Sequence, residues 1–311
     1  MALRRLARII RQNATASIAA AAALVTMLFV PPDAAYLGYF DLNTLACLFA
    51  LLAVIRALRN AGFFETVAHA VVRRFKTLRG LGCALVGVTL VCSMFATNDM
   101  ALLMLLPLST VTLASTGNER ALPFTFVMQA IAANLGGMLT PFGNPQNLYL
   151  YSYFSIPTGE FVTAMFPPFL LAVILITVAC LAVPATPISF CGERETLPAG
   201  RLAVYLALFA LSILVVFRGI PYIIGLIVIP VALFIIDKKA LREVDYGLLL
   251  TFVCFFIFSG NMSRIPAVSA LMRPLVGGSA KLELVSAALS CQAISNVPSA
   301  ILLSRFAKSW K

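Results

Sequence analysis

The chain has 311 residues, of which 61% are hydrophobic and only 11% are charged. Soluble domains carry about 25% charged residues, so this composition excludes an ordinary water-soluble fold. Apolar runs of about 18 residues or more recur along the chain, and each is long enough to cross about 30 Å of hydrocarbon. We therefore predict an all-α polytopic protein that crosses the cell (plasma) membrane several times, with the lipid bilayer as its surroundings.

The net charge of +11 comes from 23 Lys and Arg residues against 12 Asp and Glu residues. Basic residues collect in the cytoplasmic loops of membrane proteins, so this charge does not indicate nucleic acid as a partner. A cytoplasmic amino terminus leaves the outer loops at residues 31–41 and 149–160 without any basic residue. It places most of the basic residues inside: Arg4, Arg5, Arg8, Arg11, those between 56 and 79, Arg120, Arg194, Arg201, Lys238, Lys239 and Arg242.

The seven cysteines are scattered and form neither a CxxC motif nor a cluster with the only histidine, His69. They are typical of small buried side chains rather than of disulfides or metal ligands. The chain also lacks HExxH and any glycine-rich phosphate loop, which argues against an intramembrane enzyme. We expect no cofactor, and no ion other than a coupling H⁺ or Na⁺.

The first repeat is predicted to span residues 16–183, after a basic cytoplasmic tail at residues 1–15. Apolar spans are expected at residues 16–30 and 42–58. Between residues 62 and 76, apolar positions recur at helical spacing against a basic face, which predicts an amphipathic helix on the cytoplasmic surface.

The next segment contains two short apolar stretches, residues 81–95 and 100–114, on either side of Ala96-Thr97-Asn98-Asp99. Half-length segments around a polar tip predict a re-entrant hairpin with its tip at residues 96–99. Asp99 is the only acidic residue within the apolar segments. A carboxylate at mid-membrane costs about 2.5–3.5 kcal/mol, so it is expected to face water, an ion or a proton path, or to cap the following helix.

A second interruption follows the span that starts at residue 122. Its sequence is Thr140-Pro141-Phe142-Gly143-Asn144-Pro145-Gln146-Asn147. Two prolines, a glycine and three amides cannot form a regular helix, so we predict a broken helix at residues 140–147. Apolar character resumes at residues 148–154, and a full span at residues 161–183 closes the repeat.

The second repeat, residues 201–311, follows a polar cytoplasmic linker at residues 184–200. Its predicted spans are residues 202–217, 222–236 and 248–259. A loop with Arg264, Arg273 and Lys281 is expected next, followed by a second hairpin, whose arms are residues 282–294 and 299–306 and whose tip is Ser295-Asn296-Val297-Pro298. Two hairpins that enter from opposite sides are typical of inverted-topology repeats.

The two tips offer two kinds of ligand chemistry. Free N–H groups at the amino end of a helix suit an anion, whereas amide and hydroxyl oxygens suit a cation such as sodium. Asn98 and Asn296, preceded by Thr97 and Ser295, allow both roles and also simple helix capping.

The two tips and the interruption at residues 140–147 together resemble the ion transporter superfamily. The chain is most similar to the anion permeases of the arsenite-efflux and sodium/proton-antiporter branch, which includes citrate-transporter-like proteins. The divalent anion:sodium symporters are more distant. The resemblance runs from about residue 42 to residue 306. It implies an elevator-type movement of a transport domain against a scaffold that often forms a homodimer.

The resemblance also implies a binding site at the tips and the break. The substrate and ion positions it implies are Thr97, Asn98, Asp99, Thr140, Gly143, Asn144, Pro145, Gln146, Asn147, Ser295 and Asn296, with sodium held by Thr97, Asn98, Gly143 and Asn144. Asp99 stands where the symporters have a threonine. An ionised carboxylate would repel a dianion, which favours proton coupling or a substrate of low charge.

The hypothesis is therefore a secondary active transporter that couples H⁺ or Na⁺ to a small anion such as citrate, another carboxylate or arsenite. Compared with the family, a second broken helix and a last span are missing after Val297, about 60 residues by span length. The alternative is accordingly a truncated membrane protein that does not transport, or one that a partner completes.

Overall fold

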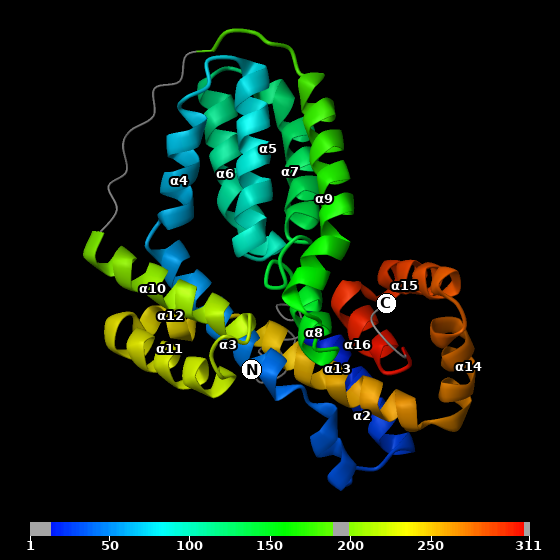
Figure 1. Ribbon diagram of the computed structural model, residues 1–311. Coiled ribbons are helices and arrows are strands. Elements are labelled where there is room, and N and C mark those ends of the chain that lie inside the picture. The colour runs from blue at the N-terminus through cyan, green and yellow to red at the C-terminus, as the bar shows by residue number, and fades with distance from the viewer. Residues whose placement is uncertain (1–13, 189–198, 308–311) are drawn as a thin grey trace, which may run out of the picture. The chain divides into compact units, whose positions relative to one another are not determined.

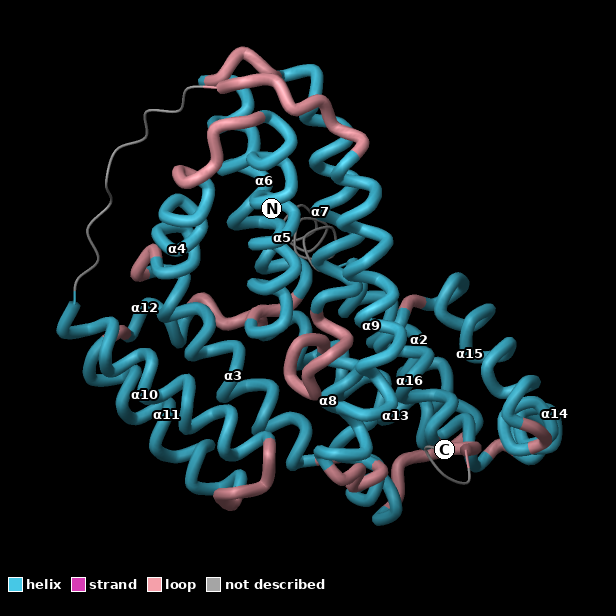
Figure 2. The backbone as a smooth tube through the Cα atoms, turned by 45° about the horizontal axis from the view of Figure 1, so that its top comes forward, coloured by secondary structure: helices cyan, strands magenta, loops and turns pink. Residues whose placement is uncertain are grey.

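The structure is a computed structural model that describes residues 14–188 and 199–307. Helices joined by short loops make up these residues, and no β-strand occurs among them (Figure 2). Helices long and apolar enough to cross a membrane are α3 (Leu42–Asn60), α5 (Leu78–Phe95), α6 (Asn98–Ser115), α9 (Thr158–Leu181) and α13 (Tyr246–Arg264). The predicted all-helical class is confirmed for the described residues.

The chain forms two compact units, and each is described by itself. Of the described residues, the first unit contains 14–49, 149–156 and 244–307, and the second contains 50–148, 157–188 and 199–243. The division into two inverted repeats stays a prediction. Most of the predicted tail (1–13) and of the linker (189–198) lies outside the described residues.

The second unit is built around four helices that lie side by side: α5, α6, α7 (Leu122–Gly136) and α9 (Figure 1). Thr77 starts α5, because its side chain accepts a hydrogen bond from the Gly80 N–H (3.2 Å). The interface of α5, α7 and α9 is apolar and buries Val86, Leu90, Met128, Ala132, Ile176 and Cys180.

A shorter helix, α4 (Phe63–Val72), packs against α5 and α6 in the same unit. Its buried side chains are Phe64, Ala68 and Val72, spaced by four residues as one helix face requires. The helix predicted at residues 62–76 is therefore present, although it ends earlier. Its position on the cytoplasmic surface stays a prediction.

The second unit also contains the turn η2 (Glu119–Ala121) and the helices α10 (Ala199–Val216), α11 (Tyr222–Ile236) and α12 (Lys238–Arg242). The turn η2 links α6 to α7, and α10 packs against α11. The bounds of α11 agree with the prediction. Asp237 begins α12 by accepting the Ala240 N–H.

The first unit is organised around α13, which packs along α2 (Ala14–Phe29) and contacts the turn η1 (Ala34–Tyr39). Next come α14 (Pro266–Gly277), α15 (Ala280–Ile294) and α16 (Asn296–Ser304). Side chains of α14 pack with Val276, Leu303 and Phe306 in a small apolar cluster.

The prediction of a loop around Arg264, Arg273 and Lys281 was wrong. Arg264 ends α13, Arg273 lies within α14, and Lys281 lies in the first turn of α15. Pro266 is well suited to begin α14, because a proline at the start of a helix loses no hydrogen bond. The partly buried apolar residues of α14 recur every three or four positions, which favours a packed helix over a loop: Val268, Met272 and Leu275.

Candidate functional site

The first polar tip is a very short turn between α5 and α6. Only Ala96 and Thr97 lie outside the two helices, so Asn98 and Asp99 begin α6 rather than lying in the turn as predicted. Both helices have 18 residues, or about 27 Å at 1.5 Å per residue. They are longer than the half-length arms that were predicted, and a re-entrant path for this hairpin stays a prediction.

Asp99 lies exposed in the first turn of α6. Within the described part of the chain its carboxylate accepts no hydrogen bond, and Thr97 makes no side-chain cap. Helix capping, the alternative role considered for Asp99, is therefore not what the structure shows.

Asn98 connects the tip to α7. Its amide nitrogen donates to Asn134 Oδ1 (2.9 Å), and the Asn134 amide nitrogen donates to the Ala130 carbonyl (2.9 Å). Asn134 was not among the predicted site residues, because it is a single amide within an apolar span. Its contact makes α7 a support for the tip.

The interruption after α7 is present but begins and ends earlier than predicted. Residues 137–144 are not helical, whereas residues 140–147 were expected to be broken, and α8 (Pro145–Tyr153) starts at Pro145. Proline fits the first position of a helix, which has no N–H partner to lose. Gln146 and Asn147 consequently lie in the first turn of α8.

Side chains brace this broken segment from within. The amide nitrogen of Asn147 lies 3.2, 3.2 and 3.3 Å from the carbonyl oxygens of Gly137, Met138 and Thr140. Thr140 Oγ1 donates to the carbonyl of Met94 in the last turn of α5 (2.7 Å). The structure thus brings the broken segment and the first tip to the same end of α5 and α7.

Asn144 lies in the interior of the break. Its side chain is 5% exposed, and its Oδ1 atom is buried without a hydrogen-bond partner among the described residues. A Cβ atom on Gly137 would lie 2.7 Å from this oxygen, so glycine permits the approach. An unpaired buried acceptor costs about 1–3 kcal/mol, which a bound cation or donor would offset. Amide and carbonyl oxygens suit sodium, and the described residues contain no cluster of three or more His, Cys, Asp and Glu side chains.

A buried polar bridge lies deeper in the same helices. Gln129 is fully buried, its amide nitrogen donates to Thr89 Oγ1, and its Oε1 accepts from Ser109 Oγ, both at 2.9 Å. These contacts connect α5, α6 and α7. The sequence offered no signal for this bridge beyond one polar residue within an apolar run.

The second tip belongs to the first unit. Only Ser295 separates α15 from α16, and its φ of 72° and ψ of 167° are rare for a residue with a side chain. The interruption predicted at residues 295–298 is therefore shorter: Asn296, Val297 and Pro298 lie in the first turn of α16. Ser295 and Asn296 are exposed, and their part in a binding site stays a prediction.

Apolar helices of spanning length that are interrupted at polar, incompletely paired positions are the architecture of multi-pass membrane transporters. The family model described as "citrate transporter" matches residues 5–309. The chain belongs to this citrate transporter family, as the resemblance predicted. It is a membrane transporter of a family that is generally not enzymatic.

Curated relatives agree with this assignment. An uncharacterized transporter of Methanocaldococcus jannaschii is 30% identical over 272 residues, which is 86% of this chain and 73% of the relative. The inner membrane protein YbiR of Escherichia coli K12 is 29% identical over 269 residues, 85% of this chain and 71% of the relative. The silicon efflux transporter LSI3 of Oryza sativa subsp. japonica is 34% identical over 141 residues, 45% of this chain and 28% of the relative. The predicted orientation and homodimer stay predictions.

Proposed function

We propose that the protein is a secondary active transporter that couples H⁺ or Na⁺ to the movement of a small anion or weak acid. The observation that carries the proposal is a pair of polar groups at one end of α5–α7, one exposed and one buried, that no other side chain pairs. Asp99 has a carboxylate without a partner in the described chain, and the nearby break holds the unpaired Oδ1 of Asn144. Such groups are costly in a membrane and are kept where an ion or substrate binds.

The proposed roles follow from the donor types. Oxygen atoms of Thr97, Asn98, Gly143 and Asn144 would hold sodium, while Asp99 would bind a proton or contribute its charge to a cation. Asn147 has its amide nitrogen shared among three carbonyls, so we assign it to holding the break in shape. The other predicted positions are assigned to substrate or ion contact: Thr140, Pro145, Gln146, Ser295 and Asn296.

Charge narrows the choice of substrate. The first-turn N–H groups of α6 suit an anion, but the carboxylate of Asp99 beside them would repel a doubly charged one. A weak acid that is neutral or singly charged satisfies both conditions. The substrate panel should therefore contain arsenite, silicic acid as a compound of the silicon in the rice relative's name, and citrate as the highly charged comparison.

The test is uptake into proteoliposomes under a pH gradient or a sodium gradient imposed separately. Wild type, Asp99→Asn and Glu283→Gln are compared, since Glu283 also lies in the first turn of a helix. We expect gradient-driven accumulation of a panel substrate in wild type and Glu283→Gln. In Asp99→Asn the rate of this uptake should fall about tenfold or more, and a tenfold fall equals about 1.4 kcal/mol. Wild-type rates in Asp99→Asn, or no gradient-driven uptake of any panel member by wild type, would contradict the proposal.

The sodium site is tested by stability. Sodium at 100 times its Kd would raise the unfolding free energy of wild type by about 2.7 kcal/mol, compared with the same concentration of choline in place of sodium. We expect Asn144→Ala to lose this difference and Asn60→Ala, an amide at the exposed end of α3, to keep it. An equal sodium effect in both variants would rule out Asn144 as a ligand.

A further inference from the structure

We infer that the second unit carries a binding site for an anionic phospholipid at the end of α5, α7 and α9 that lies away from the first tip. The site is a groove lined by Leu78, Phe124 and the segments 117–121 and 182–184, called here the Arg120 groove. It lies at the start of α5, whereas the tip follows the end of that helix. It is therefore separate from the proposed transport site and independent of it.

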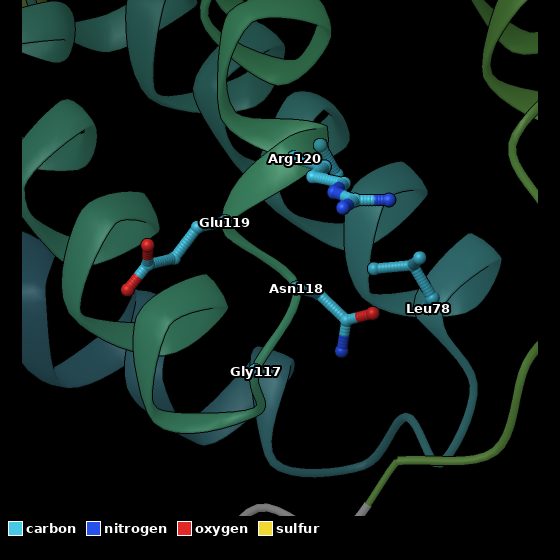
Figure 3. A pocket seen from close by; sticks show the side chains of 6 residues that line it. Leu78, Gly117, Asn118, Glu119 and Arg120 are labelled. Carbon is cyan, nitrogen blue, oxygen red and sulfur yellow. The ribbon is translucent and has the colours of Figure 1, made fainter.

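The groove consists of two adjoining hollows of about 300 and 360 Å³ that share Leu78, Arg120 and Ala121. The loop 117–121 forms one side of the first hollow (Figure 3). Phe124 and the segment 182–184 line the second. These volumes are at the lower end of the range of about 300–1,000 Å³ typical of small-molecule sites, which suits a lipid headgroup.

The wall of the groove is held in place by hydrogen bonds. The Leu78 N–H donates to the Thr186 carbonyl (2.8 Å), and the Ile188 N–H donates to the Lys76 carbonyl (2.9 Å). Arg79 Nε donates to the Val183 carbonyl (2.7 Å). The chain that follows α9 is thereby fixed on the start of α5, so the groove exists without a ligand.

Charge in the groove favours an anion. Arg120 is exposed and has no acidic partner in the described part of the chain. Glu119 also lines the first hollow, but Figure 3 shows its side chain pointing away from Arg120, Asn118 and Leu78. A guanidinium group binds phosphate through two parallel hydrogen bonds.

The surroundings favour a lipid over a free anion. Phe124 is 38% exposed at the groove, and α9, which ends at the groove, has exposed apolar side chains: Leu170, Leu171, Ile174, Leu175, Val178 and Leu181. Acyl chains would cover this surface while the phosphate binds Arg120. Basic pockets between membrane helices bind the head groups of anionic lipids in this way.

The test is lipid binding to the purified full chain, counted by native mass spectrometry during titration with phosphatidylglycerol or phosphatidylcholine. Arg120→Gln is compared with Arg242→Gln, which removes another exposed arginine, from α12 of the same unit. We expect wild type and Arg242→Gln to prefer phosphatidylglycerol and Arg120→Gln to bind it about fivefold more weakly, since one arginine near anionic lipid contributes about 1 kcal/mol.

Three results would overturn the inference. These are equal binding of the two lipids by wild type, equal losses in the two variants, and displacement of phosphatidylglycerol by millimolar inorganic phosphate, which would indicate a site for a free anion. Circular dichroism of each variant confirms folding, and the exposed side chains give no reason for either variant to misfold.

Discussion

The buried bridge at Gln129 yields a stability prediction that depends directly on the geometry. Gln129→Leu removes two hydrogen bonds that join α7 to Thr89 of α5 and Ser109 of α6, both 2.9 Å long. Interhelical hydrogen bonds in membrane proteins contribute on average about 0.6 kcal/mol each, so the variant should lose about 1 kcal/mol of unfolding free energy.

The loss should stay small because no donor is left unpaired. Thr89 Oγ1 still donates to the Leu85 carbonyl (2.7 Å), and Ser109 Oγ still donates to the Leu105 carbonyl (3.0 Å). Leucine also fills most of the volume that glutamine leaves, which limits any cavity.

The assay is reversible unfolding in mixed micelles with increasing dodecyl sulfate, followed by circular dichroism. Gln292→Leu serves as the control, because Gln292 is exposed on α15. A loss above about 3 kcal/mol would mean that buried groups are left unsatisfied, and no difference from the control would mean that the bridge does not stabilise the helices.

Three further substitutions test local features. Gly137→Ala places a Cβ 2.7 Å from the buried amide oxygen of Asn144 and should lower the unfolding free energy by about 1–3 kcal/mol. Gly87→Ala, whose Cβ would have no atom within 4 Å, should be neutral or stabilising in the same unfolding assay. The hydrogen bond from Arg264 lowers the pKa of Asp33, so the pair stabilises the fold above the ordinary pKa of about 4, and this stability is lost as pH falls through the lowered value. The melting temperatures of wild type and Asp33→Asn should therefore differ at pH 7 and converge in acid. An equal difference at every pH would refute this prediction. Ser295→Gly should raise the melting temperature by relieving a φ of 72°, a gain of up to about 1 kcal/mol after the entropy of glycine is subtracted, and an equal rise in Ser295→Ala would show that strain is not the cause.

Hydrophobic patterning predicted the bounds of a helix well where a proline or a charged residue marks each end of the apolar run. The helix Tyr222–Ile236 is preceded by Pro221 and followed by Asp237, and its predicted bounds agree with the structure. The charges of Arg264, Arg273 and Lys281 suggested a loop instead, because the short apolar face of α14 is visible only once its packing partners are known.

The sequence predicted an interruption after α7, but neither its exact bounds nor the residues that support it, and the ligands of the candidate site stay a prediction. Prolines mark the break, yet Pro145 starts the new helix instead of lying in the loop. Asn134 and Gln129 act through partners 36 and 40 residues away, and such pairings depend on helix packing that one sequence does not reveal.

The central claim is that Asp99 couples an ion to the substrate, and coupling is reciprocal because both share one free-energy cycle. The most direct measurement is therefore ion movement driven by substrate alone, recorded with pH-sensitive and sodium-sensitive dyes inside proteoliposomes that carry no ion gradient. Adding substrate should move one of the two ions in wild type and neither in Asp99→Asn. Substrate entry without ion movement in wild type, or undiminished ion movement in Asp99→Asn, would contradict the account.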